Sequence, residues 1–552
     1  MSSASELNPP VRDPSVEETR LPTRVLQNWM NQVARAIPTY NPLNVLDFGA
    51  RGNGIADDTA AFQKAVDQAA HQNGAQIIIP MGTYMVGTIT FPSGNAPIQL
   101  IGLGELSILK RNVTLPPGVG LLDILGSNVT LDGFVIDGDV TVPVGLFYNA
   151  DFMGIGGNDP MADSLTRNSS IWLHGGTSNF VCQRVTIQHT GGYAGLIDAG
   201  QVGIRDVRFL NCRLQNNRPN LFGIPGGQPI YGSWTGGIYC NGDGRPGHPG
   251  AVVKQFLVTQ CQFTRNTGNQ IWQHLYGLQE LHEDFQVYEN FLEDIGLDGI
   301  LIGGVVSGNV SNNVLHRIGY TTSTDTDNPV PRWLAGVQAT AIDTSGLAMG
   351  VNYQGNVITS VNGGALDLDG HADSSLVGNT VRIPVVGDPD YVTDSIAISG
   401  FANTGSTSYG INVGNTANDP RGGKNVTMSG NTLLNLSAGA IRIYSARNCL
   451  VTANDIVAPD QPVAPPMSYG PGGTGVNQQP SGNVIRYNRV QYNPPIAAPV
   501  VFEDPSVGPF TGADVNYVYG NTPIIGAGGL AFEFQKDPNS GSPTYLQTVW
   551  FQ

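Results

Sequence analysis

Charged residues are scarce in this sequence. They make up 13% of its 552 residues, about half of the ~25% found in an average soluble protein. Basic residues are fewer than acidic ones, with 27 Lys and Arg against 43 Asp and Glu, and the formal net charge is −16. A nucleic-acid-binding protein needs a basic stripe that displaces counterions, and none is visible. We therefore expect no nucleic-acid partner.

Long apolar runs are missing as well. No segment approaches the ~18–20 apolar residues of a membrane span, so we expect no membrane partner. The first 40 residues also lack the apolar core of a secretory signal. The localisation stays open between a protein that acts inside the cell, a virion-associated protein and a secreted protein whose signal has been removed.

Cysteines are few and odd in number. None has the C-x-x-C spacing of a zinc site or a redox pair, and each lies inside an apolar, strand-like stretch. Buried free thiols are the interpretation that fits this pattern, and they are typical of a reducing compartment. The five positions are Cys182, Cys212, Cys240, Cys261 and Cys449.

Glycine, in contrast, is abundant. The 72 glycines are roughly twice the usual share of ~7%, and they follow no three-residue period, which excludes collagen. Many short strands joined by turns fit such a composition. A chain of 552 residues predicts several domains unless the fold is a solenoid that grows by repetition.

The N-terminal part predicts a tail and a cap. Residues 1–43 comprise a polar tail followed by a helix over Leu21–Ile37, where apolar residues recur at helical spacing. After a short strand and turn, Asp57 or Asp58 is placed to cap a second helix. Its apolar stripe consists of Phe62, Ala65, Val66 and Ala69.

A family resemblance lies in this cap. The string NVLDFGARGNGIADDT at residues 44–59, a helix, and IIIPMGTY at residues 77–84 resemble the N-terminal cap of the pectate-lyase and rhamnogalacturonase/epimerase-like superfamily. That superfamily includes polygalacturonase-like hydrolases, alginate epimerases and phage tailspikes. The resemblance implies an all-β fold, a single-stranded right-handed parallel β-helix with an N-terminal helical cap. For a tailspike-like protein it also implies a homotrimer.

A repeat supports this fold. Asn or Cys precedes an apolar residue by two places in successive turn-flanked segments, which predicts side chains stacked along a solenoid axis. The spacing of 23 residues recurs three times, and we interpret spacings of 43, 49 and 52 as two rungs with insertions. The positions are Cys212, Cys261, Asn290, Asn313, Asn356, Asn379, Asn431, Asn454 and Asn488.

The repeat and the cap divide the chain into segments. Residues 44–100 form the cap and first rungs, and residues 101–495 form the parallel β-helix. Pro and Gly become more frequent after residue 495, so residues 496–552 are expected to be a C-terminal cap or a subunit contact.

One strand of each rung predicts a ridge of outward-facing side chains. Its apolar pairs begin at Ile238, Ile271, Ile300, Thr340, Leu366, Ile396 and Ile441, and the residues between and just after each pair point outward. Aromatic rings, carboxylates and a guanidinium on one ridge suit a sugar chain. The substrate-binding residues we expect are Tyr239, Asn241, Trp272, His274, Asp298, His371, Arg442 and Tyr444.

Three aspartates are the candidate catalytic residues. Asp343 and Asp369 are expected at the same height on neighbouring strands, with Asp367 two places before Asp369. Carboxylates this close cannot all ionise freely, so one pKa should rise and supply a general acid. Glycoside hydrolysis needs one such acid and one carboxylate that activates water or attacks. Alternatives are turn residues, or a Ca²⁺ site formed with Asp373; otherwise we expect no cofactor.

These residues predict a polysaccharide-degrading glycoside hydrolase. The layout is similar to that of polygalacturonase-like hydrolases, but Arg442-Ile443-Tyr444 lacks their Lys and the Gly-His-Gly motif is absent, which argues against a polyuronate substrate. The alternatives are a polysaccharide lyase, in which Arg442 and Tyr444 would neutralise a uronate and act as base, and a phage tailspike-like glycan-binding protein or depolymerase.

Overall fold

The computed structural model describes residues 42–535. Its gaps are residues 114, 117, 139–168, 218–235, 267, 320–338, 345, 362, 384–408, 416–418, 437–438, 459–465, 471–479, 493–497, 504–515 and 526–530. The helix expected over Leu21–Ile37 and the last residues, 536–552, lie outside the described residues.

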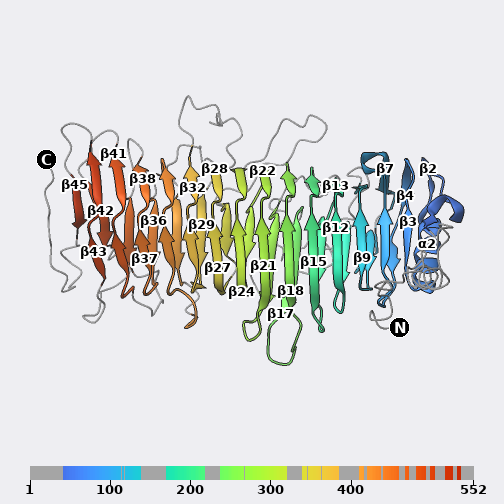
Figure 1. Cartoon of the computed structure of the whole chain (residues 1–552), viewed down its shortest axis with the longest axis horizontal. Coiled ribbons are helices and arrows are strands. Elements are labelled where there is room, and N and C mark those ends of the chain that lie inside the picture. Colours follow the sequence, from blue (N-terminus) through green and yellow to red (C-terminus); the bar gives the residue numbers. More distant parts are fainter. Residues whose placement is uncertain are drawn as a thin grey trace, which may run out of the picture.

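Three long parallel sheets form an elongated stack (Figure 1). After its first two strands the chain passes repeatedly from the first sheet to the second and third and then returns, so each of these turns adds at least one strand to every sheet. In chain order the first is sheet A, the second sheet B and the third sheet C. The predicted all-β fold, a right-handed parallel β-helix with an N-terminal helical cap, is confirmed.

Sheet A has 16 strands. They are β1 (Leu43–Asn44), β3 (Ala75–Ile78), β6 (Ile98–Ile101), β9 (Val129–Asp132), β12 (Ser178–Gln183), β15 (Ile204–Leu210), β18 (Val253–Thr259), β21 (His282–Tyr288), β24 (Val305–Ser311), β27 (Ala348–Gln354), β30 (His371–Ala372), β31 (Ser375–Val377), β34 (Thr427–Ser429), β37 (Leu450–Thr452), β40 (Val484–Arg486) and β43 (Tyr517–Tyr519).

Sheet B has 15 strands. They are β2 (Asn53–Asp57), β4 (Gly82–Val86), β7 (Ser107–Arg111), β10 (Val135–Asp137), β13 (Thr186–Gln188), β16 (Arg213–Gln215), β19 (Gln262–Thr264), β22 (Phe291–Ile295), β25 (Val314–Ile318), β28 (Val357–Val361), β32 (Thr380–Arg382), β35 (Thr432–Leu434), β38 (Asp455–Ala458), β41 (Arg489–Tyr492) and β44 (Thr522–Ile525).

Sheet C has 14 strands and carries the candidate site. They are β5 (Ile89–Phe91), β8 (Leu122–Ile124), β11 (Ile171–His174), β14 (Gly195–Asp198), β17 (Ile238–Asp243), β20 (Ile271–Tyr276), β23 (Ile300–Ile302), β26 (Ile342–Thr344), β29 (Gly364–Asp369), β33 (Tyr409–Gly414), β36 (Ile441–Tyr444), β39 (Met467–Gly470), β42 (Ala498–Glu503) and β45 (Ala531–Gln535).

Helix α2 (Thr59–His71) covers the N-terminal end of the stack (Figure 1). Its predicted apolar stripe, including Phe62 and Val66, is fully buried. The two candidate capping carboxylates, Asp57 and Asp58, accept hydrogen bonds from different segments. Asp57 Oδ1 accepts the Thr59 N–H at 3.0 Å, while Asp58 accepts the backbone N–H groups of Arg51 and Gly52 at 2.7 and 3.2 Å and so holds the preceding turn.

The predicted ladder of Asn and Cys side chains is confirmed. Within the ladder, each Asn accepts hydrogen bonds from the ladder residue before it and donates Nδ2–H to a backbone carbonyl and to the next Asn, as Asn356 does to Val310 and Asn379 at 2.9 Å each. Cys212 and Cys261 continue the ladder toward the N-terminus. All five cysteines are buried free thiols, as expected.

Two expectations about the rungs are corrected. Asn313 Nδ2 donates directly to Asn356 Oδ1 at 3.0 Å, so the 43-residue spacing is one rung with an insertion and not two rungs. The spacings of 49 and 52 are single rungs for the same reason. The β-helix also continues beyond residue 495, because β42 and β45 pair in register with sheet C.

Candidate active site

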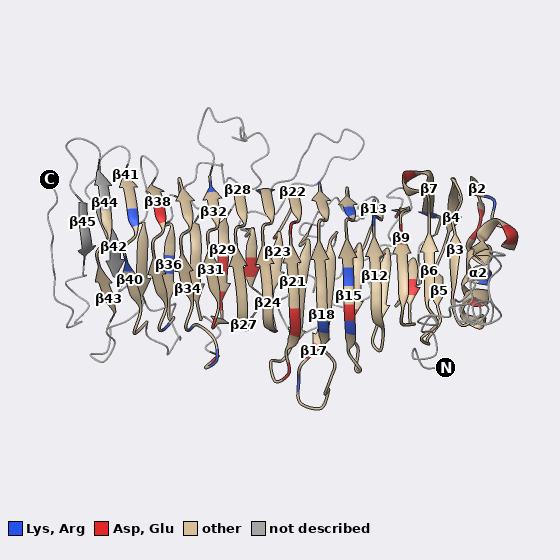
Figure 2. Cartoon of the chain, viewed as in Figure 1, with Lys and Arg blue, Asp and Glu red and all other residues tan. Residues whose placement is uncertain are grey.

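The outer face of sheet C carries a continuous row of side chains across seven strands. The strand register aligns Tyr239, Trp272, Leu301, Asp343, Asp367, Asn412 and Arg442. Side chains in such a row follow one another at the strand spacing of ~4.8 Å. Figure 2 shows acidic residues on β29, in the middle of the stack.

The register of β26 differs from the expected one by two residues. Ile342 pairs with Ile300 and Leu366, where the sequence pattern had placed Thr340 opposite Ile300. Asp343 therefore lies beside Asp367 and not beside Asp369. The structure thus brings Asp343 and Asp367 closer together than predicted, and it leaves Asp369 two residues further along β29.

The rung after β29 is also different. The stretch Ile396–Ile398, expected there, lies outside the described residues, and β33 pairs with β29 instead. This strand adds two polar side chains that the sequence reasoning missed. Tyr409 Oη donates to Asp367 Oδ2 at 2.6 Å, and Asn412 Nδ2 donates to Asp367 Oδ1 at 3.0 Å. The apolar pair Ile411 and Val413 was the available signal for this strand.

Asp298 joins the aspartates from the turn before β23. Its Oδ1 accepts the backbone N–H of Thr340 at 2.7 Å, from the turn before β26. Burial and the charge of Asp367 raise the pKa of Asp298 to about 7. The expectation that Asp298 stands near the cluster therefore agrees with its position. Asp298, Asp343, Asp367 and Asp369 are named together below as the aspartate cluster.

Asp343 has the most perturbed carboxyl of the aspartate cluster. Burial and the charges of Asp298 and Asp367 raise its pKa to about 9, because both effects disfavour the ionised form. The pKa of Asp367 is also raised by burial, while its hydrogen bonds with Tyr409 and Asn412 favour its carboxylate. At neutral pH Asp343 thus holds a proton next to the carboxyl group of Asp367, which is fixed by two donors.

Arg442 and Tyr444 lie on β36, beyond Asn412. Arg442 donates from Nε and Nη2 to Tyr444 Oη at 3.1 and 3.0 Å. Its guanidinium also lies over the rings of Tyr409 and Tyr444, at 5.5 and 4.8 Å from the ring centroids. These contacts place one cation and two phenol groups at the edge of the aspartate cluster.

The aromatic end of the row is covered instead of exposed. Tyr239 is 1% and Trp272 8% exposed, and their rings lie 4.3 Å apart. Tyr193 stacks on Tyr239 at 4.9 Å. Asn241 and His274 are neighbours in the next row, with 3.4 Å between Oδ1 and Nδ1. Tyr239 and Trp272, which were predicted to face outward and bind sugar, are therefore buried side chains in this structure, and their role in substrate binding stays a prediction.

His371 does not lie on this face. It is fully buried on β30 in sheet A, where Nε2 is 2.6 Å from Tyr353 Oη. Its expected place among the substrate-binding residues is corrected, since the turn at Gly370 carries the chain from sheet C into sheet A. Asp373 is exposed and accepts from Asn425 at 2.7 Å, so it is engaged away from Asp367 and Asp369.

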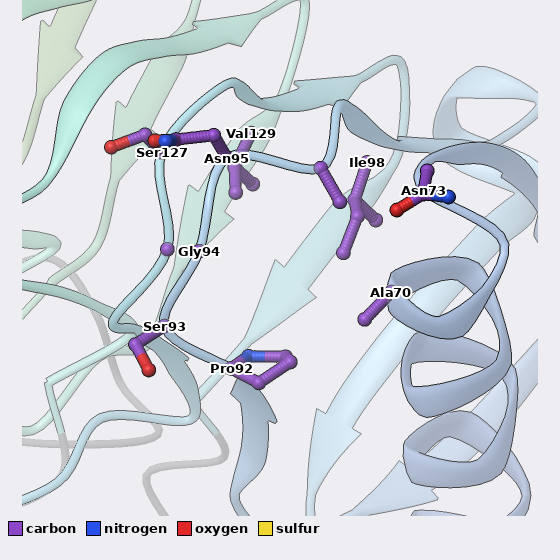
Figure 3. A pocket seen from close by; sticks show the side chains of 11 residues that line it. Ala70, Asn73, Pro92, Ser93, Gly94, Asn95, Ile98, Ser127 and Val129 are labelled. Carbon is purple, nitrogen blue, oxygen red and sulfur yellow. The ribbon is translucent and has the colours of Figure 1, made fainter.

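The described residues contain neither a metal site nor a membrane-spanning helix, and one hollow lies away from the aspartate cluster. Among the residues that the structure describes, no group of three or more His, Cys, Asp or Glu has the arrangement of a metal site, and no helix there is long and apolar enough to span a membrane. A hollow between α2 and the turns near Ser93 and Ser127 (Figure 3) has no ionisable side chain in its lining. That hollow is separate from the aspartate cluster.

Comparisons with known proteins agree with the N-terminal motif. Residues 43–127 match the sequence model of the family described as rhamnogalacturonase A/epimerase, pectate lyase-like, so the predicted resemblance is confirmed. Mannuronan C5-epimerase AlgE5 of Azotobacter vinelandii is 32% identical over 161 residues, which are 27% of this chain and 15% of the epimerase.

Two other proteins are similar to this chain. The pre-neck appendage protein of Bacillus phage phi29 is 35% identical over 104 residues, 16% of this chain and 11% of that protein. The structure of PfbA, a surface adhesin of Streptococcus pneumoniae, has 15% identity and a TM-score of 0.47, and the match covers 91% of this chain and 93% of PfbA. This chain spans only 15% and 11% of the length of the epimerase and the phage protein.

Proposed function

We propose that this protein is a polysaccharide-degrading enzyme, a glycoside hydrolase whose catalytic residues are Asp343, Asp367 and Asp369. The observation that carries the proposal is the protonated Asp343 beside the hydrogen-bonded Asp367 on one outer face. The family match over residues 43–127 and the similarity to an enzyme named for its action on mannuronan support a carbohydrate-active enzyme.

In this proposal Asp343 is the general acid. Its raised pKa keeps the carboxyl protonated at neutral pH, so it can donate that proton to the glycosidic oxygen as the bond to the anomeric carbon breaks. Asp367 or Asp369 then acts as the carboxylate that activates a water molecule or attacks the anomeric carbon. Tyr409 and Asn412 hold Asp367 in one orientation by their hydrogen bonds.

The charge of the site favours an uncharged sugar. Four aspartates are gathered there, and Arg442, the cation at their edge, already donates to Tyr444. A uronate would bring another negative charge into a partly buried site, which costs free energy. Arg442 and Tyr444, together with Asn241 and His274 along the next row, are the substrate-binding residues of the proposal.

A polysaccharide lyase is the second candidate. Arg442 and its contact with Tyr444 favour it, because β-elimination needs a cation that neutralises a uronate and a base of high pKa. The similarity to a phage appendage protein favours a tailspike-like depolymerase, in which the same cluster would work within a homotrimer.

A panel of purified polysaccharides tests these proposals together. We expect the wild-type protein to release reducing ends from a neutral glycan without any gain in ultraviolet absorbance from a new carbon–carbon double bond. Reducing ends accompanied by that absorbance would replace the hydrolase with a lyase. Light scattering on the same sample would detect the trimer, and a trimer that releases no reducing ends would favour a binding protein.

A further inference from the structure

A second set of polar side chains lies on sheet C, between the aspartate cluster and the N-terminal end of the β-helix. The strand register places His174, Asp198, Asn241 and His274 next to one another on β11, β14, β17 and β20. Five strand spacings separate β11 from β26, which amounts to ~24 Å. His174 is therefore too far from Asp343 to take part in the same chemical step.

His174 is held by a buried carboxylate. Its Nε2 lies 2.7 Å from Asp123 Oδ1, and the side chain of Asp123 is only 4% exposed while that of His174 is 25% exposed. An ionised carboxylate only accepts hydrogen bonds, so Nε2 carries the hydrogen and Nδ1 is an acceptor when the imidazole is neutral. Within the described part of the chain, no hydrogen bond satisfies this Nδ1.

Trp172 supplies a donor at the same place. Its ring stacks on His174 with 5.1 Å between centroids and 9° between planes. The side chain is 5% exposed, and its indole Nε1–H is buried and has no hydrogen-bond partner among the residues that the structure describes. An unsatisfied buried donor costs free energy, so a site that retains one is expected to gain an acceptor from a ligand.

These atoms match a hydroxyl group. A hydroxyl can accept one hydrogen bond and donate another, so sugar hydroxyls supply both the acceptor for Trp172 Nε1–H and the donor for His174 Nδ1. Asp198 on the next strand is an acceptor for a neighbouring hydroxyl. The row then continues through Asn241 and His274 toward the aspartate cluster along the same face.

We propose that Trp172, His174 and Asp198 form a distinct binding site for the hydroxyl groups of an uncharged glycan chain, at a distance from the aspartate cluster. The glycan as ligand rests on the proposed function, whereas the site itself rests on the Asp123–His174 pair and the orphaned indole. A glycan bound here and at Asp343 lies along the β-helix axis. Its affinity then depends on both this site and the aspartate cluster, whereas the bond-breaking step depends on the aspartate cluster alone.

Binding measurements on variants test the site. His174→Phe keeps a ring against Trp172 but removes both nitrogens, and Trp172→Phe removes the indole donor. His189→Phe is the matched control. His189 is also partly exposed and lies 3.1 Å from an aspartate, Asp137, but it directly follows β13 of sheet B and is not on sheet C. Affinity is measured by calorimetry against dextran, galactomannan and polygalacturonate, and melting temperatures verify that each variant is folded.

We expect a neutral polysaccharide to bind about tenfold more weakly to His174→Phe and a few-fold more weakly to Trp172→Phe, with His189→Phe unchanged. Wild-type affinity in both variants, or no binding of any of the three polysaccharides by the wild type, would overturn the site. Reducing-end release by the wild type and Asp343→Asn is followed in parallel. Weaker binding by His174→Phe without any release by the wild type would overturn the proposed hydrolase alone.

Discussion

The charge of Asp298 helps to hold Asp343 in the protonated form. Each carboxyl is partly buried, and the charge of Asp298 is one of the causes that raise the pKa of Asp343 to about 9. The pKa of Asp298 itself rises to about 7, so above neutral pH Asp298 is the charged partner and Asp343 keeps its proton. Asp298 thereby tunes the proposed general acid without contacting the reacting atoms.

Removing the charge of Asp298 should therefore narrow the pH range of activity. We expect kcat/KM of the wild type to fall as the pH rises through about 9, where Asp343 loses its proton. In Asp298→Asn this alkaline limb should move to lower pH by ~0.5–1 unit, because a nearby negative charge has gone. A pH profile measures the shift. An unchanged limb would mean that Asp343 is not the group whose titration is observed.

Two buried histidines predict an acid-sensitive fold. Burial lowers the pKa of His282 to about 4 and that of His371 to about 3, whereas an unfolded chain titrates histidine near ~6.5. The unfolded state therefore binds more protons below that pH. Stability from these residues is complete above pH ~6.5 and is lost as the pH falls to about 4 for His282 and to about 3 for His371.

For His282 the predicted loss is ~3 kcal/mol of unfolding free energy between these limits. Urea titrations at several pH values on the wild type and on His282→Gln measure it, since the variant lacks the titrating group. Equal pH slopes for the two proteins would contradict the assignment.

The Asn ladder is the element that ties the rungs together. Asn356 lies in the buried turn between sheets A and B. It donates to the backbone of Val310 on β24 and to Asn379, and it accepts from the backbone and side chain of Asn313. The stacking satisfies amides that water cannot reach, which explains why the same residue type recurs at this turn.

Asn356→Ala should therefore destabilise the protein by ~3–5 kcal/mol, because several buried donors and acceptors lose their partner at once. Asn352→Ala is the control, since Asn352 is exposed on β27, outside the ladder, and accepts from Ser375. Urea denaturation of both variants gives the comparison. A similar small effect in both would show that the ladder is not a main source of stability.

The register of the strands could not be predicted from the sequence. Alternation of apolar and polar residues distinguishes inward from outward positions, but a slip of two residues leaves that alternation intact. Thr340–Ile342 and Ile342–Thr344 therefore fit the pattern equally well, and only the pairing of Ile342 with Ile300 selects the second. The partners Tyr409 and Asn412 were missed because a similar apolar pair, at Ile396 and Ile398, occurs before them.

At the scale of the molecule, the repeat predicted the fold well. A 23-residue spacing of Asn and a recognisable cap determine a parallel β-helix, since each rung buries its face only against its neighbours. The number of rungs was less predictable, because turns accept insertions at little cost, as the 43 residues between Asn313 and Asn356 show. The burial of an outward-facing ring such as Tyr239 could not be predicted either, because the pattern of apolar and polar residues shows only that its side chain points out of the β-helix.

The central claim is that the aspartate cluster cleaves a polysaccharide, and single carboxyl-to-amide changes test it most directly. Asp343→Asn and Asp367→Asn are compared with Asp373→Asn, which alters an exposed aspartate close by in sequence but outside the cluster. We predict that the rate of reducing-end release falls at least ~100-fold in the first two variants and stays at the wild-type level in Asp373→Asn. Wild-type rates in Asp343→Asn and Asp367→Asn would contradict the account.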